Sequence, residues 1–448
     1  MEKKIALDVI NSHAAGIDVG SRSHHVAVGQ DLIRDVKEFG VYAASHEQMI
    51  AWLRERKVKT IAMESTGSYW QTLFASLQCA GFEVILVNGN QIKNVKGKTD
   101  VKDCRWIQKL HTLDLLRGSF LPAEHTAQMR TYYHHRQSMI EESSKMINKM
   151  QKAMRLMNVR LDIAVSDIKG KSGIAIIEAI LRGERDGEKL AALADWRVKK
   201  SRQEISQALQ GNWRKELLYE LKDCYELYQI FQVKMEKCDK EIEQLLKGIT
   251  TKMNPAAKTS LSKVTQKRQA KNQVNFNLPK LSYVYTGVDL FAIEGVSYNT
   301  IMSFIAEVGD GIKKFATAKQ FDSWLRLAPN NKISGNKRIS SRTPQGKHRF
   351  AQSLLQAANT VGQMKKGVLP SFFKRIAFKK GRQAAIVATA RKTAVIIWNM
   401  ITHQIPYKPL EERQYSTKVK NAILRNIKNK LERLDLTIND LALLSKSS

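Results

Sequence analysis

Four acidic residues in the first quarter of the chain have the types and the order that metal-assisted phosphodiester chemistry needs. Asp18 lies within the apolar segment GIDVG, Glu64 ends the apolar segment TIAME, and Asp100 and Asp103 share the segment TDVKD. A carboxylate in an apolar strand needs a compensating partner. Converging carboxylates repel one another unless a cation lies between them, and Mg²⁺ or Mn²⁺ prefers such oxygen ligands. We therefore predict that these four acids are catalytic metal ligands, because bound metal ions can activate an attacking oxygen and stabilise a leaving one.

Each acid taken alone has a simpler interpretation as a strand-end or helix-end carboxylate. Asp100 is well placed to cap the helix that the segment VKDCRWIQ predicts. At a spacing of three, Asp100 and Asp103 share one face of that helix. The joint order of strand Asp, strand Glu and helix Asp-x-x-Asp is more specific. It is the layout of ribonuclease-H-like and Holliday-junction-resolvase-like nucleases.

The elements around these acids alternate between strand and helix patterns. Residues 13–40 predict three short strands, and VKTIAMES and FEVILVN predict two more. Helices are predicted between and after them, in SHEQMIAWLRERK with Ser45 as its cap, in SYWQTLFASLQCAG and in VKDCRWIQKLHTL. This alternation predicts an α/β domain with a mixed sheet over residues 1–125. The order of the acids within it resembles the ribonuclease-H-like (Holliday-junction-resolvase-like) class.

A competing interpretation concerns the segment GIDVGS, which also resembles the first phosphate motif of actin-like ATPases and sugar kinases. Those proteins need a second Asp-Gly phosphate strand and a Gly-rich adenosine motif later in the chain. The sequence contains neither motif. The strong positive charge also argues against a small-molecule kinase.

The rest of the chain divides into a helical arm, a basic segment, a second domain and a tail. Met139, Met146, Met150, Met157 and Leu161 predict one long amphipathic helix, and residues 201–249 predict another. Together they suggest an antiparallel coiled-coil arm over residues 126–250. The remaining predictions are a basic linker or insert at 251–285 with its aperiodic core at 252–280, a mainly α-helical domain at 286–405 and a basic helical tail at 406–448.

The charge balance indicates a polyanionic partner. The 448 residues include 74 Lys and Arg against 42 Asp and Glu, which gives a formal net charge of +32. Nucleic acid is the first candidate and an anionic membrane surface the second. The sequence contains no run of 18 apolar residues and no signal-peptide pattern, so we expect a cytoplasmic protein with no membrane partner.

The positive charge is concentrated in the second half of the chain. From Ser323 to Leu410 there are seventeen Lys and Arg and no acid, a span that should bind phosphates. Just before it, LFAIEGVSYNTIMSFIAEVG predicts a helix-hairpin-helix-like element with its turn at Gly295, although a plain helical hairpin fits as well. Within the span we predict nucleic-acid contacts from Lys332, Lys337, Arg338, Arg342, Lys347 and Arg349.

A serine lies among these cations. The segment NNKISGNKRISSRTPQGKHRF is predicted to be a loop and contains Ser334, Ser340 and Ser341. A loop serine is usually a turn residue, and its hydroxyl is a weak nucleophile unless a base or a metal activates it. In a chain with an acid cluster, Ser334 is also a candidate nucleophile.

The ordered motifs of the chain resemble those of one family. The chain resembles the DEDD-type transposases of bacterial insertion sequences, the bridge-RNA-guided serine recombinases. The resemblance spans most of the chain and is carried by GIDVG, AMESTGSYW, KTDVKD, KSGIAIIEAILRGERD, IEGVSYNTIMSFIAEVG, FDSWLRLAPNNKISGNK and ARKTAVIIWNM.

The resemblance implies a resolvase-like N-terminal domain, a coiled coil and a C-terminal transposase domain. By motif position it implies metal binding by Asp18, Glu64, Asp100 and Asp103, and a nucleophilic role for Ser334 through a phosphoserine link to DNA. It further implies that a structured noncoding RNA, acting as a guide, pairs with donor and target DNA, in the manner of other guided systems. The implied assembly is a homodimer or homotetramer, bacterial and nucleoid-associated, in which the serine of one subunit meets the acids of another.

Some positions depart from the family pattern. Many relatives have a second serine directly before the Ser-Gly pair, where this chain has Ile333. Ser334 therefore remains the favoured nucleophile, with Ser340 and Ser341 behind it. The segment 252–280 matches no motif of the family. Two other functions stay open: a metal-dependent, junction-resolving nuclease that uses water as the nucleophile, and a non-catalytic nucleic-acid-binding protein.

Overall fold

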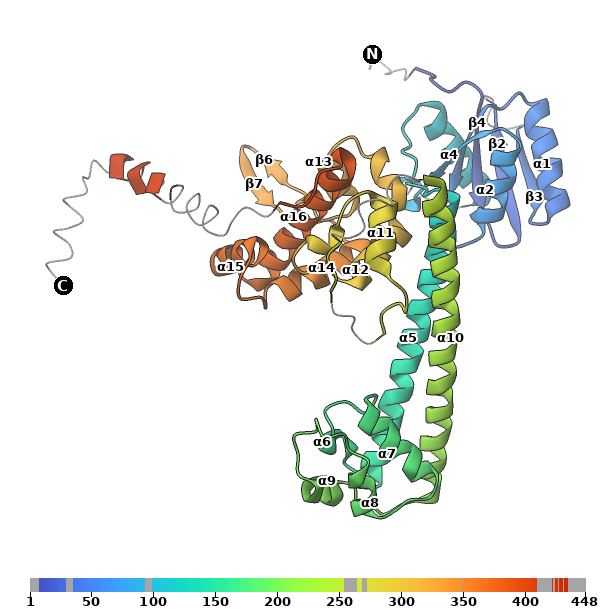
Figure 1. The fold of residues 1–448 in the computed structure, drawn as a ribbon. Coiled ribbons are helices and arrows are strands. Elements are labelled where there is room, and N and C mark those ends of the chain that lie inside the picture. Colours follow the sequence, from blue (N-terminus) through green and yellow to red (C-terminus); the bar gives the residue numbers. More distant parts are fainter. Residues whose placement is uncertain are drawn as a thin grey trace. The chain divides into compact units, whose positions relative to one another are not determined.

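The computed structural model describes residues 8–29, 35–92, 99–253, 264–267, 272–346 and 348–408, and in the tail residues 421, 424–425, 427–429 and 431–433 (Figure 1). The chain forms two compact units, Met1–Leu121 and Pro122–Ser448. Of the predicted tail helix, most residues lie outside the described part. The same holds for 254–263 and 268–271 of the predicted insert.

The first unit is built on a five-stranded sheet of order β3-β2-β1-β4-β5. Strands β1, β2 and β3 pair antiparallel, whereas β1, β4 and β5 run parallel. This confirms the predicted mixed sheet and its five strands. Their bounds are β1 Ala14–Val19, β2 Ser23–Val28, β3 Val36–Gly40, β4 Thr60–Glu64 and β5 Glu83–Val87.

Helices cover both faces of this sheet (Figure 1). On one face Ile17 and Met63 are buried with Met49 and Leu73, and on the other Ala62 is buried with apolar residues that include Ile107. The helix predicted to follow Ser45 begins earlier, at Ala43, because two alanines extend it toward Tyr42, whose side chain makes no cap bond. The helices are α1 Ala43–Glu55, α2 Trp70–Cys79, α3 Gly89–Ile92 and α4 Asp100–Thr112.

The second unit contains the arm, formed by the long helices α5 (Glu124–Leu156) and α10 (Lys215–Met253). Residues 129–139 share a core with 235–249, and residues 146–157 share another with 217–225. The two helices therefore pack antiparallel, as the apolar stripes predict. Between them lie α6 Leu161–Ala164, α7 Lys171–Leu181, α8 Gly187–Ala192 and α9 Arg202–Ala208.

Both predicted arm helices were too long. Helix α5 ends at Leu156. Asn158 has a left-handed φ of 61°, which turns the chain off the helix axis before it reaches Leu161. The helix predicted over 201–249 is two helices, because the chain turns at Gly211 and Trp213. A Cβ on Gly211 would lie 2.7 Å from the Met157 carbonyl oxygen, so this turn is packed against the end of α5.

The remainder of the second unit is a helical domain with one small hairpin. Its core includes Phe291, Phe304, Phe321 and Phe350 and also receives the near ends of α5 and α10. The elements are α11 Leu278–Thr286, η2 Leu290–Ala292, α12 Tyr298–Glu307, η3 Gly309–Lys314, α13 Ala318–Trp324, β6 Lys332–Ser334, β7 Lys337–Ser340, α14 Arg349–Val361, α15 Val368–Lys380 and α16 Arg382–His403.

The element predicted as helix-hairpin-helix-like is simpler in the structure. Its first helix is only the 3₁₀ turn η2, and Gly295 takes a left-handed φ of 77°. A Cβ on Gly295 would lie 2.7 Å from the Ala357 carbonyl oxygen, so the turn packs against α14. Ser297 caps α12 reciprocally with Thr300. The glycine and the serine therefore have structural roles here.

Helix α16 is the one described helix long and apolar enough to cross a membrane by length and composition. Half of its most apolar window is buried inside the fold. Ala390, Ala394 and Ile397 on this helix belong to the core of the second unit. Its apolar character thus has a structural explanation within that core.

Candidate active site

Asp18 and Glu64 lie at the ends of two neighbouring parallel strands. Ile17 of β1 is in register with Met63 of β4, so the two acids are the next residues along adjacent strands. Side chains alternate between the faces of a sheet, which places Asp18 on the face of Gly16 and Glu64 on the face of Ala62. This is the face that α4 covers, since Ala62 packs in one core with Ile107.

Gly16 explains how close α4 comes to the sheet. A Cβ at this position would lie 2.2 Å from the Gln108 backbone nitrogen and 2.5 Å from the Cys104 carbonyl oxygen. Only a glycine admits the helix backbone this near. The Gln108 side chain also donates to the Gly29 carbonyl at 2.7 Å. The helix is thereby fixed against β1 and β2.

The first turn of α4 brings the other two acids to the same face. Thr99 is the N-cap, and its hydroxyl accepts from the Lys102 backbone nitrogen at 3.4 Å. Asp100 and Asp103 both lie in the first turn, where the helix dipole favours negative charge. The alternative that Asp100 caps this helix is therefore wrong, because Thr99 already does so.

The charge on Asp18 is strongly influenced by its surroundings. Burial, as the largest cause, and the charges of Glu64, Asp100 and Asp103, in that order of importance, together raise the pKa of Asp18 to about 6. Each of the other three predicted acids is thus close enough to Asp18 to disfavour its charged form. The thiol of Cys104 lies nearby, and burial together with the Asp18 charge raises its pKa to about 12.

His25 is a member of this cluster that the sequence reasoning missed. It lies opposite Asp18 in the antiparallel register of β1 and β2, and its charge lowers the pKa of Asp18. Its Nδ1 is 3.9 Å from an Asp100 oxygen and its Nε2 is 3.8 Å from a Glu38 oxygen. The two adjacent histidines in SHHVAV could have indicated this member, because side chains alternate along a strand. One of two neighbouring histidines therefore lies on the sheet face of the acids.

The donor set suits a hard divalent cation. Carboxylate oxygens are the ligands that Mg²⁺ and Mn²⁺ prefer, and a cation would relieve the repulsion around Asp18. Gly89 leaves room for the Glu64 carboxylate, since a Cβ there would lie 2.6 Å from its Oε1. Among the described residues, no three His, Cys, Asp or Glu side chains are already grouped as ligands of one ion. The residues fit a metal in kind, and rotation of their side chains would have to bring them together.

Ser334 lies in a hairpin, where the sequence predicted a loop. It is the last residue of β6 and pairs with Lys337, the first residue of β7. Gly335 and Asn336 connect the strands with φ angles of 51° and 61°. Two consecutive positive φ angles define the tight turn that Gly and Asn favour between antiparallel strands. The Gly-Asn pair was the signal for a hairpin, and it fixes where the serine is presented.

The hairpin is cationic and exposed. Ile333 and Ile339 are 65% and 70% exposed. Ser340 accepts a hydrogen bond from the Arg342 backbone nitrogen at 3.3 Å, which gives it a structural role. Ser334 makes no side-chain hydrogen bond to a described residue. Of the predicted nucleic-acid contacts, Lys347 lies outside the described residues and five are exposed, namely Lys332, Lys337, Arg338, Arg342 and Arg349.

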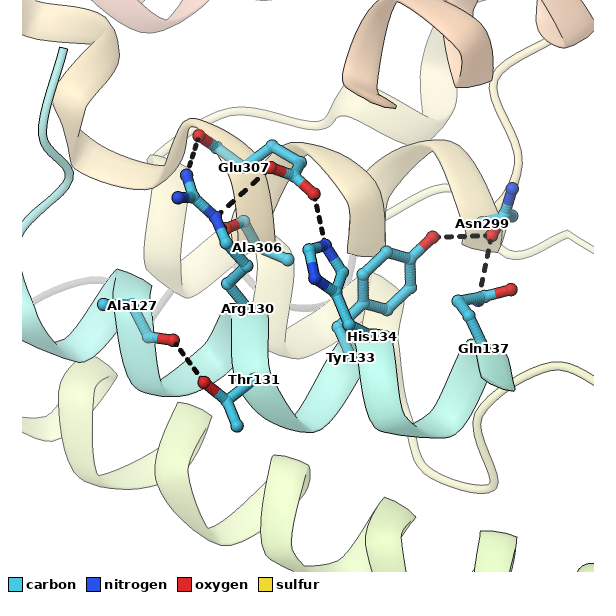
Figure 2. A network of polar contacts seen from close by, with 9 residues as sticks. All are labelled: Ala127, Arg130, Thr131, Tyr133, His134, Gln137, Asn299, Ala306 and Glu307. Carbon is cyan, nitrogen blue, oxygen red and sulfur yellow. Dashed lines mark hydrogen bonds and ion pairs between the residues drawn. The ribbon is translucent and has the colours of Figure 1, made fainter. Parts of the chain in front are cut away.

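A buried polar network lies between α5 and α12 in the second unit (Figure 2). The Glu307 side chain of α12 is only 8% exposed and bonds the ring of His134 at 2.6 Å and the guanidinium of Arg130 at 3.2 Å. Arg130 also donates to the Ala306 and Glu307 carbonyls. Burial would raise the pKa of Glu307, but His134 and Arg130 outweigh it and lower the pKa overall. The network joins α5 firmly to α12.

His348 links this network to the hairpin. It lies directly before α14, and its ring centroid is 4.2 Å from that of Trp324. Burial lowers its pKa to about 4, with Glu307 opposing that shift and Arg130 and Arg326 adding to it. Arg326 in turn donates to the Gln345 carbonyl. Both ends of the hairpin segment are therefore held to the domain, and neither Glu307 nor His348 was singled out from the sequence.

The region with the four acids and the region with the serine hairpin each match a family of transposases. Residues 15–159, which include all four acids, match a transposase model of the DEDD type named for IS110. Residues 289–374, which include the hairpin, match the transposase IS116/IS110/IS902 family. Together the matched regions span just over half of the chain.

Two curated relatives are similar over shorter stretches. A transposase for the insertion sequence element IS1111A of Coxiella burnetii is 31% identical over 26% of this chain and 33% of its own length. A probable family 20 transposase of Pseudomonas aeruginosa is 25% identical over 27% of this chain and 36% of its own length. The similarity thus spans about a third of each relative.

Proposed function

Since the chain belongs to the IS110/IS116 family of transposases, we propose that it is an insertion-sequence transposase that cuts and rejoins DNA through a serine nucleophile. The observation that carries this proposal is the convergence of Asp18, Glu64, Asp100 and Asp103 on one face of the sheet, with the pKa of Asp18 raised by burial and by the other three acids. Carboxylates whose pKa is perturbed by burial and by like charges cluster at functional sites.

We propose that these acids hold Mg²⁺ or Mn²⁺ in a ribonuclease-H-like domain. When bound, the metal supplies charge stabilisation for a phosphodiester that is being cut. Asp18 and Glu64 supply carboxylates from the strands, and Asp100 and Asp103 supply them from the start of α4. His25 offsets part of the negative charge beside Asp18.

The covalent step that we propose uses Ser334. Its hydroxyl oxygen bonds to the phosphorus of the DNA strand, the bond from phosphorus to the 3′ oxygen breaks, and the serine proton leaves as the 3′ oxygen gains one. The exposed cations Lys332, Lys337 and Arg338 would offset charge on the phosphate. The phosphoserine link conserves the bond energy, so the strands can rejoin without ATP.

The remaining partners are proposals that rest on the resemblance and on the charge of the chain. We propose donor and target DNA as substrates, a structured noncoding RNA as guide, and a homodimer or homotetramer as the active assembly in the bacterial cytoplasm. The net charge of +32 supports binding of several nucleic-acid strands. We further propose, as the resemblance implies, that the serine of one subunit meets the acids of another.

A covalent-adduct assay tests the mechanism. The purified chain is incubated with Mg²⁺, the noncoding RNA encoded beside its gene, and labelled donor and target DNA, and the products are run on denaturing gels before and after protease treatment. We expect a protease-sensitive protein–DNA adduct that Ser334→Ala removes. The matched control is Ser341→Ala, an exposed serine of the same segment, which should keep the adduct.

The same assay distinguishes the alternative function. If the DNA is cleaved to free ends without any adduct, and Ser334→Ala cleaves it equally well, the serine mechanism is wrong. That result would favour a junction-resolving nuclease that uses water as the nucleophile. Asp18→Ala should abolish cleavage in both cases while nucleic-acid binding persists. Cleavage that survives Asp18→Ala would contradict the metal site itself.

A further inference from the structure

The tip of the arm, defined here as residues 157–214, is a small folded region with its own core. Met157, Val159, Ile176, Ile180 and Leu190 are buried in it together with residues from the adjoining turns of α5 and α10. A hollow of about 760 Å³ opens on this tip between residues 162–172 and 195–200. Sites for small ligands typically have about 300–1,000 Å³, so this one can accept a group as large as a nucleotide.

The three acids that line the hollow already have partners, and one of them, Asp167, accepts from the Lys169 backbone nitrogen at 2.9 Å. Asp195 bonds Arg197 at 2.9 and 3.1 Å, and these bonds lower the pKa of Asp195 to about 2. Asp162 bonds Arg155 and Arg160. By contrast, the lining residues Lys171, Lys199 and Lys200 are exposed and enter no salt bridge with any described residue. Lys171 and Lys200 lie near enough to Asp195 and Glu204 to help lower the pKa of those acids, but all three ammonium groups remain exposed and can contact an anion at this hollow.

Trp196 is the second unusual feature of the tip. Its side chain is 89% exposed, although both of its chain neighbours, Asp195 and Arg197, line the hollow. The other tryptophan of the tip, Trp213, is partly buried against the tip core, with the Arg185 guanidinium 4.8 Å from its ring. Trp196 also has a cation beside it, since the Arg197 guanidinium lies 5.8 Å from its ring, but the ring remains exposed. An exposed ring beside a guanidinium is suited to stacking on a base.

We propose that the arm tip binds an unpaired nucleic-acid strand, with a base stacked on Trp196 and the adjoining phosphates held by Lys171, Lys199 and Lys200. Exposed aromatic rings beside cations are the usual means of holding single strands, because every base has a face to stack and every linkage carries a charge. A protein partner would instead need a broad apolar surface, whereas half of the residues that line this hollow are charged. The site uses neither the four acids nor Ser334, so it stands independently of the proposed reaction.

Photo-crosslinking of the full-length chain tests this proposal. Short single strands of RNA and of DNA that carry 5-iodouracil, and a duplex of the same sequence, are irradiated with the protein, and the crosslinked peptides are identified by mass spectrometry. We expect a crosslink at Trp196 with a single strand. Trp196→Ala should weaken single-strand binding about tenfold, and Lys199→Ala with Lys200→Ala should reduce the Trp196 crosslink by a similar factor.

Two matched variants control for general effects. Tyr219→Ala removes another exposed aromatic ring, on α10, and Lys189→Ala removes a tip lysine that pairs with Glu184. Both should leave the Trp196 crosslink and the affinity unchanged. A stronger crosslink with RNA or with DNA would identify the source of the strand, and either supports the site.

Three results would overturn the proposal. One is the absence of a tip crosslink under conditions where the segment 332–349 crosslinks. Another is a crosslink with the duplex alone, since a paired base cannot stack on the ring. The third is loss of self-association, measured by sedimentation, in Trp196→Ala with unchanged nucleic-acid binding, which would make the tip a contact between subunits.

Discussion

The acid cluster and the serine hairpin hold their reactive groups in opposite ways. Asp18 lies in a half-buried position beneath a helix that approaches the sheet through Gly16, and its pKa is raised to about 6. Ser334 projects from an exposed two-stranded hairpin, and a Cβ on the neighbouring Gly335 would meet nothing within 4 Å. The first site is packed and electrostatically unfavourable, whereas the second is open and positively charged.

This difference matches what each site would bind. The strands and the start of α4 bring the acids to one face of the sheet, where they would bind a cation, while the hairpin presents Ser334 to a strand of DNA. An ion is small, so a site that binds one can have a fixed backbone and needs only rotation of its side chains. A site that waits for a DNA strand has to remain accessible. The following changes test the contrast, in decreasing order of expected effect.

Gly16→Ala should have the largest effect on folding. The added Cβ would lie 2.2 Å from a backbone nitrogen of α4, which no side-chain rotation can relieve. We expect the free energy of unfolding of the first unit to fall by about 3 kcal/mol or more, measured by urea denaturation. Gly248→Ala is the control, because a Cβ there meets nothing within 4 Å. Equal stability of the two variants would show that α4 does not lie this close to β1.

Asp18→Asn should stabilise the metal-free protein by about 1 kcal/mol near neutral pH, after allowance for solvent screening. The folded pKa of Asp18 exceeds the unfolded value, so its favourable contribution is complete below about pH 4 and is lost as the pH rises through 6. The gain should therefore be visible in thermal unfolding at about pH 8 and vanish near pH 4.

Added Mg²⁺ sharpens the same comparison. It should raise the thermal stability of the natural chain at about pH 8 and have little effect on Asp18→Asn, because the variant has lost one ligand and one repulsive charge. An identical Mg²⁺ response in both proteins would argue against a metal site at Asp18.

Gly335→Ala should disturb the serine with little effect on the fold. The left-handed φ of 51° costs an alanine about 1 kcal/mol, and the open surroundings add no clash. We expect an almost unchanged unfolding midpoint and a clear drop in adduct yield, since the turn sets the position of Ser334. Asn336→Gly, which tolerates its positive φ, should retain the adduct. Full activity of Gly335→Ala would mean that the turn geometry is unimportant.

Lys337→Ala and Arg338→Ala should produce the smallest changes. Each is expected to lower DNA affinity a few-fold and to reduce the slope of log affinity against log salt by about one, if each contacts a phosphate. Fluorescence anisotropy over a range of salt concentrations measures both quantities. Lys222→Ala, which removes an exposed lysine paired with Glu226, should leave the slope unchanged.

Much of the first unit was predictable because its signals are local. Alternating and β-branched segments predicted all five strands, and the positions of Asp18 and Glu64 at strand ends followed from them. The approach of α4 to Gly16 was not predictable, because it joins residues about ninety positions apart that share no local pattern. His25 was missed for the same reason, since its role depends on which strand pairs with β1.

In the second unit the helices were predictable and their ends were not. The methionine and leucine stripes identified α5 and α10, but the breaks at Asn158 and Trp213 depend on packing within the arm tip. Glu307 lies in an apolar segment and His348 in a basic one, so neither sequence context indicates a buried polar contact. Only the fold brings Glu307 to Arg130 and His134, and His348 close to Glu307 and Arg130. Charge composition predicts the surface of such a region better than its buried polar contacts.

The construction of the arm determines how insertions could change the distance between its tip and the helical domain. Its two helices leave and re-enter the same core, and the tip has a separate core of its own. Seven residues added to α5 and seven to the facing part of α10 amount to nearly two helical turns, so the same side chains would still face the partner helix. The insertion would move the tip by about 10 Å along the arm. That step corresponds to about three nucleotides along a duplex strand. The arm is therefore a spacer whose length can be altered in heptad steps, without redesign of either end.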